Sequence, residues 1–245
     1  MYKYPLSIKQ FGEKAIIVEW PHSVEEAILY DILQFRNYLN VNFFKNNSYE
    51  LVIAYNSLTL IFYDINFDFN KTRDFLLECY KNEEQEVVFK NSLWRIPVCY
   101  EEEFGIDLIE VAEKLMMTPI QVIKNHTMTS YTVYGIGFLP GFMYLGGLSE
   151  DMEIPRRSTP RLKVAKGAVG LASKQTGIYP QESPGGWNII GNCPYPLFNA
   201  KYERPIFVSV GDKIQFYAVT KSEYDLLKIE IEIGIFSTKN MLANG

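Results

Sequence analysis

Residues 137–170 read GFLPGFMYLGGLSEDMEIPRRSTPRLKVAKGAVG, with glycine, proline and arginine in places that a plain core strand fills with valine. Glycine permits positive φ angles and close approach of neighbouring backbone, and proline fixes a bend. The stretch therefore predicts tight loops that present Phe138, Phe142, Tyr144 and Leu145. On its own, this composition is also explained by loops that only connect strands.

From Ser130 onward, short apolar or alternating runs are separated by glycine and proline, which predicts short strands. The runs are YTVYGIGF, GAVGLAS, GWNIIG, PIFVSV and KIQFYAV. Short strands at regular spacing are typical of β-barrels and β-sandwiches. The last stretch, residues 222–236, predicts a helix that runs into a strand with the sequence IEIEIGIF.

The N-terminal part mixes helix and strand patterns. KAIIVEW at residues 14–20 predicts a buried strand, and Ser23–Glu26 has the pattern of a capping box before an amphipathic helix. Residues 50–63 predict two short strands or one bent strand. A second amphipathic helix is expected at Lys71–Lys81, and a further strand at Glu86–Phe89.

A second domain is expected to begin near Leu93 with the strand WRIPVCY. Asp107–Glu110 repeats the capping-box pattern, and Thr118-Pro119 begins another predicted helix, which makes a helical hairpin. The sequence thus predicts an α+β protein. An N-terminal α/β sandwich domain is expected over residues 1–92, and a β-barrel domain with this hairpin near its start over residues 93–245.

Charge is distributed unevenly along the chain. The formal net charge of −5 argues against general nucleic-acid binding, because phosphate backbones attract a basic face. Residues 154–181, however, lack acidic side chains and contain Arg156, Arg157, Arg161, Lys163, Lys166 and Lys174. Guanidinium groups restrained beside Pro155 and Pro160 can grip a carboxylate or phosphate with paired donors. An anion site is therefore expected, with a solvated basic surface as the alternative.

The cysteines and histidines give few indications of a disulfide, a metal site or catalysis. Cys79, Cys99 and Cys193 are scattered without CxxC spacing, which predicts reduced, buried thiols. With only His22 and His126 as imidazoles, no metal site is expected. His126 is a candidate for proton transfer, or else a capping or core histidine.

Several function classes lack their motif. No GxxxxGK[ST] loop or GxSxG elbow is present, so we expect no nucleotide bound by this chain alone and no serine-hydrolase chemistry. No segment approaches the ~20 uninterrupted apolar residues of a membrane helix, and no secretory signal is visible. We expect a cytoplasmic protein that contacts neither membrane nor nucleic acid.

Together, these motifs resemble one family. The strings G-F-x-P-G-F-x-Y-L-x-G-L, P-R-R-x-x-P-R, G-x-V-G-x-A, Q-T-G-I-Y-P and S-P-G-G-W-x-I-I-G are similar to those of the allophanate hydrolase subunit 1 family, also called carboxyltransferase subdomain C/D. The match is densest from His126 to Gly191 and extends over almost the whole chain. The resemblance implies an N-terminal α/β domain followed by a cyclophilin-like β-barrel.

The resemblance implies one of two functions. Some bacterial members are B subunits of 5-oxoprolinase, which join subunits A and C in the ATP-dependent opening of 5-oxo-L-proline (pyroglutamate) to L-glutamate. KipI-like members instead bind a histidine kinase and block its autophosphorylation. We expect the first function, with ATP used by the assembled complex and with no activity in this chain alone.

For that function, the barrel rim is expected to form part of a site that the partner subunits complete. His126 is the candidate for proton transfer. The substrate-binding candidates orient the substrate carboxylate or a phosphorylated intermediate, or shape the pocket; they are Arg156, Arg157, Arg161, Lys166, Gln175, Tyr179 and Trp187.

The sequence departs from the family pattern at three places. Glu101-Glu102 stands where relatives commonly have two glycines, and Ile106 stands where a proline is expected. VAKG at residues 164–167 replaces VPAG, which adds the charge of Lys166 near the arginines. The recognised anion, and the role of Glu101–Glu103, stay open at this point.

Overall fold

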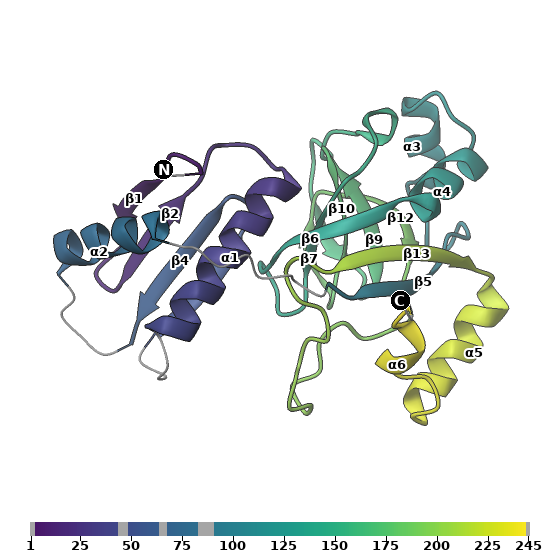
Figure 1. The fold of residues 1–245 in the computed structure, drawn as a ribbon. Helices are drawn as coiled ribbons and strands as arrows, with labels where there is room; N and C mark the ends of the chain where they lie inside the picture. The colour runs from purple at the N-terminus through teal and green to yellow at the C-terminus, as the bar shows by residue number, and fades with distance from the viewer. Residues whose placement is uncertain (1–2, 44–48, 64–67, 83–90, 244–245) are drawn as a thin grey trace. The chain divides into compact units, whose positions relative to one another are not determined.

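The computed structural model describes residues 3–43, 49–63, 68–82 and 91–243. The chain divides into two compact units, residues 1–90 and 91–245 (Figure 1). The sequence-based division falls two residues later. Among the described residues, none of the helices combines the length and apolar character needed to cross a membrane.

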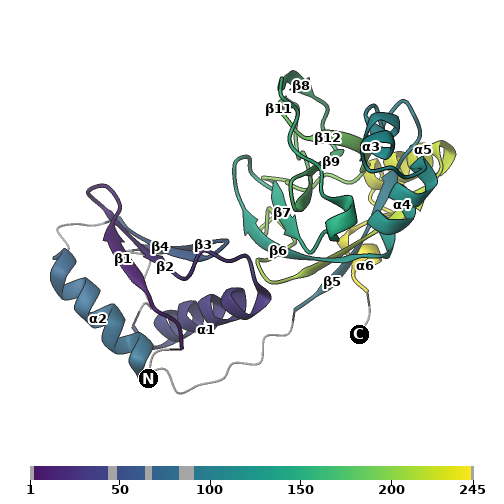
Figure 2. The ribbon, with the colours of Figure 1, turned by 90° about the horizontal axis from the view of Figure 1, so that it is seen from above.

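The N-terminal unit is an antiparallel sheet with two helices on one of its faces (Figure 2). The strand order is β1-β2-β4-β3. The strands are β1 (Ser7–Gln10), β2 (Ala15–Glu19), β3 (Tyr49–Ala54) and β4 (Ser57–Phe62), and the helices are α1 (Glu26–Asn42) and α2 (Phe69–Lys81). The predicted strand at Glu86–Phe89 lies outside the described residues.

Helix α1 buries the apolar face that its periodicity predicts, including Ile28, Ile32, Phe35 and Leu39. Its start differs from the prediction. The N-cap is Glu25, which makes no side-chain capping bond, and the Ser23 hydroxyl donates to the Glu25 carboxylate instead. The expected capping box at Ser23 is therefore wrong, because the helix begins later than the box requires.

The C-terminal unit contains a closed β-barrel that has seven strands within the described residues. The order around the barrel is β6-β13-β5-β12-β9-β10-β7, and β7 pairs again with β6. The strands are β5 (Leu93–Cys99), β6 (Ser130–Ile136), β7 (Met143–Gly146), β9 (Ala168–Ala172), β10 (Gln175–Ile178), β12 (Asn188–Asn192) and β13 (Lys213–Val219). Strands β5 and β13 run parallel, and the other neighbours are antiparallel.

Closure of this barrel confirms the fold expected for the second half of the chain. Each strand turns part of its side chains inward, and closure removes the exposed strand edges of an open sheet. The interior is filled by fully buried apolar residues of several strands, among them Ile96, Val98, Val133, Leu145, Val169, Leu171, Ile190, Ile214 and Phe216.

Four α-helices accompany the barrel within the part of the chain that the structure describes: α3 (Leu108–Lys114), α4 (Pro119–Met128), α5 (Lys221–Glu232) and α6 (Thr238–Met241). The α3–α4 pair is the predicted hairpin. Thr118 is the N-cap of α4 and forms a capping box with Gln121, and Pro119 is the first residue of the helix. Asp107 directly precedes α3 but makes no capping bond. Its carboxylate binds other partners, which are described below.

Two strand predictions near the C-terminus are wrong. The alternating run IEIEIGIF continues α5 as far as Glu232, and Gly234 follows with φ +78°. Alternation of Ile and Glu is compatible with a helix that exposes part of its apolar surface, as Ile229 and Ile233 do here. The run PIFVSV, residues 205–210, is an irregular segment that leads into β13.

The acidic run at Glu101–Glu103 contacts the start of α5. The Glu101 carboxylate accepts a hydrogen bond of 2.6 Å from the backbone N–H of Lys221, and the Lys221 ammonium lies 3.7 Å from Glu103. Carboxylates are favourable beside the free N–H groups of a helix N-terminus. These residues therefore have a structural role within the chain.

Candidate functional site

The loops highlighted by the sequence meet at a hollow of about 140 Å³. A two-stranded ribbon, β8 (Arg161–Val164) and β11 (Ser183–Gly185), lies beside it. The main walls of this aromatic hollow, as we call it, are Phe138, Phe142, Tyr144, Tyr179, Trp187 and Arg156. Bent, glycine-rich backbone presents Phe138 and Phe142 as expected, whereas Tyr144 and Leu145 belong to strand β7, and Leu145 is buried in the barrel core and does not line the hollow.

Phe142 stands at the centre of the aromatic walls. Its ring lies 4.9 Å from that of Tyr144, and 5.4 Å from those of both Tyr179 and Trp187, all with near-perpendicular or steeply tilted planes. Edge-to-face packing of this kind is the favoured geometry of aromatic pairs. The walls are consequently held in place by one another before any ligand binds.

One glycine controls the space beside these rings. A Cβ atom on Gly185 would lie 2.3 Å from the Tyr179 hydroxyl, which no side chain tolerates without movement of the ring. The neighbouring Gly186 has no such restriction, because its nearest contact would be an ordinary 3.7 Å from Pro160. The SPGGW motif thus contains one glycine that the hollow requires and one that it does not.

Arg156 is the charged group of the hollow. Its side chain is exposed, and among the described residues it has no carboxylate partner. Burial raises the pKa of the Tyr179 phenol, while the charge of Arg156 acts in the opposite direction. The hollow therefore combines a guanidinium and a neutral phenol with aromatic walls, and the guanidinium can bind a small anion.

Arg157 and Arg161 have a different environment, because both bind the buried carboxylate of Asp107. Arg161 donates two hydrogen bonds to Asp107, of 2.9 and 2.5 Å, and Arg157 donates one of 3.1 Å. Arg157 also donates to Glu110 at 2.9 Å. Hydrogen bonds from Lys114 and then from Arg157 lower the pKa of Glu110 to about 2.

We call Asp107 together with Arg157 and Arg161 the carboxylate clamp, and backbone hydrogen bonds connect it to the neighbouring elements. Asp107 accepts a 2.7 Å hydrogen bond from the Ile189 N–H of β12, and the Arg157 N–H donates to the Gly186 carbonyl at 2.8 Å. The clamp therefore ties the segment that carries Arg156 to α3, β12 and the SPGGW loop. The three arginines do not share one cationic hollow, since Arg157 and Arg161 are paired with Asp107 and Glu110, and only Arg156 lines the aromatic hollow.

His126 lies inside the barrel with no exposed surface. Its Nδ1 is 2.7 Å from the Tyr100 hydroxyl, its Nε2 is 2.9 Å from the Thr176 hydroxyl, and its ring stacks on Phe216 at 4.5 Å. Burial lowers the pKa of His126 to about 3. This placement argues against the expected proton transfer, because a substrate at the rim cannot reach either ring nitrogen.

The remaining candidates fall at separate places. Tyr179 and Trp187 are buried walls of the aromatic hollow. Gln175 is half-buried at the start of β10, where it pairs with Ala172 of β9 and Gly146 of β7. Lys166 is exposed and lines another hollow, of about 370 Å³, together with Tyr224, Lys228 and Glu232.

Asp107 is the residue beside the hollow for which the sequence pattern predicted the wrong contacts. Its position before a helix suggested a cap, but its side chain is buried and carries the clamp. A signal was available: residues 154–181 hold six cations and no acid, so any buried arginine there needs a carboxylate from elsewhere in the chain.

A closed barrel with an N-terminal α/β unit and the motifs that build the aromatic hollow defines one class of protein. The chain belongs to the family described as the carboxyltransferase domain, subdomain C and D, which matches residues 6–208. The resemblance seen in the motifs is thereby confirmed.

Particular relatives carry the name of the B subunit of 5-oxoprolinase. The one from Bacillus subtilis is 33% identical over 91% of this chain and 97% of its own length. The one from Haemophilus influenzae is 42% identical over 68% of this chain and 78% of its own. The solved structure of K. lactis urea amidolyase shares the fold at 16% identity, with a TM-score of 0.79, over 98% of this chain but only 16% of the solved chain.

Proposed function

We propose that this protein is the B subunit of a 5-oxoprolinase, which opens 5-oxo-L-proline to L-glutamate with hydrolysis of ATP, together with subunits A and C. The names of its relatives support this assignment. ATP is used by the assembled complex, and the B subunit supplies part of the substrate site. Kinase inhibition is not proposed, because no feature of the described residues favours it.

The observation that carries the proposal is the unpaired guanidinium of Arg156 in a small aromatic hollow. The substrate is a compact ring with one carboxylate, so it needs a cationic anchor and flat apolar walls. Paired N–H donors of an arginine match the two oxygens of a carboxylate. Arg156 would hold the carboxylate, and Tyr179 and Trp187 would hold the ring.

The neighbouring residues have positioning roles in this proposal. Asp107 fixes Arg157 and Arg161 and so fixes the backbone on which Arg156 sits. The neutral phenol of Tyr179 can donate a hydrogen bond to an oxygen that gains negative charge during ring opening. Proton transfer is left to groups of the partner subunits, since His126 is enclosed in the barrel.

The test is reconstitution of the complex with subunits A and C, followed by measurement of ATP-dependent glutamate formation from 5-oxo-L-proline. Arg156→Gln is expected to lower kcat/KM roughly 10- to 100-fold, as loss of a charge-assisted hydrogen bond does. Lys163→Gln removes a cation from the adjacent strand β8, where Lys163 pairs with Glu182 at the surface, and is expected to leave turnover unchanged.

Two results contradict the proposal. Failure of the wild-type chain to form a complex or to support glutamate formation removes the subunit assignment. Normal turnover of the Arg156→Gln complex keeps that assignment and removes the role of the aromatic hollow.

A further inference from the structure

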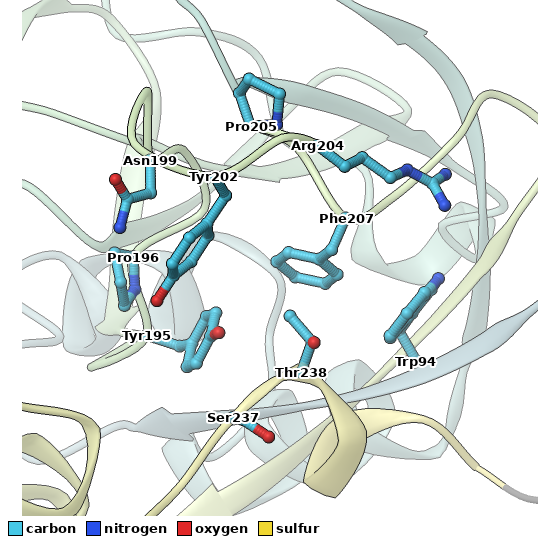
Figure 3. A pocket seen from close by; sticks show the side chains of 10 residues that line it. All are labelled: Trp94, Tyr195, Pro196, Asn199, Tyr202, Arg204, Pro205, Phe207, Ser237 and Thr238. Atoms are coloured by element: carbon cyan, nitrogen blue, oxygen red, sulfur yellow. The ribbon is translucent and has the colours of Figure 1, made fainter. Parts of the chain in front are cut away.

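A second cavity, separate from the aromatic hollow, lies beside the C-terminal segment of the barrel unit. Its volume is about 270 Å³, and it is formed where β5, the irregular segment 195–207 and the start of α6 meet (Figure 3). Its walls include Trp94, Tyr195, Tyr202, Phe207, Arg204 and Thr238. We call it the C-terminal pocket. It shares no lining residue with the aromatic hollow.

The apolar walls of the C-terminal pocket are rigid. The ring of Phe207 lies 4.9 Å from that of Trp94 and 5.7 Å from that of Tyr195, both in edge-to-face contact. The Trp94 indole donates a 2.9 Å hydrogen bond to the buried carboxylate of Asp212. The aromatic groups are therefore fixed in position, and flat faces of this kind favour a flat aromatic ligand.

The polar edge of the pocket is also held in place. The Asn199 N–H donates to the Pro205 carbonyl at 3.0 Å, and the Asn199 side chain accepts from the Lys201 N–H at 3.0 Å. These bonds close the loop 199–205, which carries both Tyr202 and Arg204. Ordering of this loop before binding reduces the entropy that a ligand must overcome.

Arg204 supplies an uncompensated charge. Among the described residues its guanidinium bonds only the Ser209 hydroxyl, at 2.7 Å, so most of its five N–H donors are available. Figure 3 shows its side chain extending from the loop backbone towards the side of the pocket where Trp94 lies. An aromatic surface and a guanidinium that has no carboxylate partner among the described residues thus line the same cavity.

We propose that the C-terminal pocket is a binding site for a small aromatic carboxylic acid. The ring packs against Phe207 and Tyr202, and the carboxylate binds the guanidinium of Arg204. A neutral aromatic molecule uses only the walls, and an aliphatic acid uses mainly the arginine. The pocket therefore selects ligands that combine both features, independently of the ring-opening reaction proposed above.

The experiment uses the full chain labelled with ¹⁵N, and follows the indole N–H signals of Trp94 and Trp187 while benzoate, benzamide or cyclohexanecarboxylate is added. Benzoate is expected to shift the Trp94 signal in a saturable manner and to bind about tenfold more tightly than benzamide, as one charge-assisted bond predicts. It is also expected to bind more tightly than cyclohexanecarboxylate, which keeps the carboxylate but lacks the flat aromatic ring. Trp187 reports the aromatic hollow and is expected to respond less.

Three variants complete the test. Arg204→Gln is expected to weaken benzoate binding about tenfold and to abolish the preference over benzamide. Lys201→Gln removes a neighbouring exposed cation that does not line the pocket, and Arg156→Gln removes the cation of the aromatic hollow; both are expected to bind benzoate normally. The proposal is overturned by equal binding of benzoate and benzamide, by unchanged binding in Arg204→Gln, or by loss of binding in Arg156→Gln.

Discussion

Two buried polar side chains show how the chemistry of single residues shapes this molecule. Asp107 is 2% exposed and is satisfied by two arginines and a backbone N–H. His126 is fully buried and is satisfied by two hydroxyl groups. A buried charge needs partners of opposite charge, whereas a buried imidazole stays neutral. The two residues therefore respond differently to substitution and to pH.

Asp107→Asn is expected to lower the free energy of unfolding by about 2–3 kcal/mol. The change keeps the shape of the side chain, but within the described residues it leaves the partly buried guanidinium of Arg161 without a carboxylate and leaves Arg157 with Glu110 alone. Urea unfolding followed by near-UV circular dichroism measures the loss. Glu182→Gln breaks only the exposed pair with Lys163 and is expected to change stability by less than about 0.5 kcal/mol. Equal losses of unfolding free energy in the two variants would contradict a stabilising role of the carboxylate clamp.

His126 makes stability dependent on pH in a defined direction. Its pKa is about 3 when folded and about 6.5 when unfolded, so only the unfolded chain takes up a proton as the pH falls. The stabilisation is complete above pH 6.5 and is lost progressively towards pH 3. Between pH 7.5 and 5.5 this group alone is expected to cost about 1.4 kcal/mol.

Two measurements check the histidine prediction. Proton NMR of the folded chain should show the ring signals of His126 unchanged from pH 8 to pH 5, with His126→Gln used to assign them. Urea unfolding at pH 7.5 and 5.5 should show a smaller pH dependence in His126→Gln than in the wild type. Titration of the His126 ring near pH 6 in the folded protein would show that the imidazole is accessible.

At the scale of secondary-structure elements, the loops and caps decide geometry more than the strands do. The aromatic hollow depends on the tight approach of the SPGGW loop to the ring of Tyr179. Helix α5 depends on a capping box in which Thr220 accepts from the Glu223 N–H and Glu223 binds back to Thr220. Each feature can be tested by comparing substitutions at two nearby residues, only one of which makes the contact.

Gly185→Ala is expected to deform the aromatic hollow while leaving the fold intact. The added Cβ would meet the Tyr179 hydroxyl at 2.3 Å, so the ring must move. In the reconstituted complex, activity is expected to fall at least about tenfold, because displaced positioning groups cost catalysis of that order or more. Gly186→Ala adds the same methyl group one residue later, where its nearest contact would be an ordinary 3.7 Å from Pro160, and should retain activity. Comparable losses of activity in both variants would contradict the prediction that activity depends on the position of the Tyr179 ring in the hollow.

Thr220→Ala is expected to lower the free energy of unfolding by about 1 kcal/mol, since it removes the acceptor for an N–H group at the start of α5. Ser222→Ala changes a neighbouring exposed residue in the first turn that is not the cap, and should alter stability by less than about 0.5 kcal/mol. Urea unfolding measures both variants. Equal free energies of unfolding for the two variants would show that the Thr220 cap does not stabilise the protein.

For the whole molecule, the division into two compact units has a consequence for stability. The barrel unit encloses its own core, and barrel closure satisfies its strands internally. We expect residues 91–245, expressed alone, to unfold cooperatively with heat and to keep the near-UV circular dichroism of buried aromatic side chains. A fragment without a cooperative transition would show that the barrel requires residues 1–90.

Much of the fold is readable from local patterns, and particular elements show why some is not. The periodicity of α1 and the Thr118-Pro119 start of α4 each specify a structure through neighbouring residues, and both are correct. The IEIEIGIF run fits both a helix and a strand. Its helical form depends on whether a sheet partner is available, which no local pattern contains.

The candidate site divides in the same way. The sequence alone determined the family, and through that resemblance the barrel. It also determined the loops that carry Arg156, Tyr179 and Trp187, because turn residues act over a few neighbours. Only the tertiary structure decided which arginine is free. Asp107 lies some fifty residues from Arg157 and Arg161, and burial forces a charge to find its partner in space, whatever the separation along the chain.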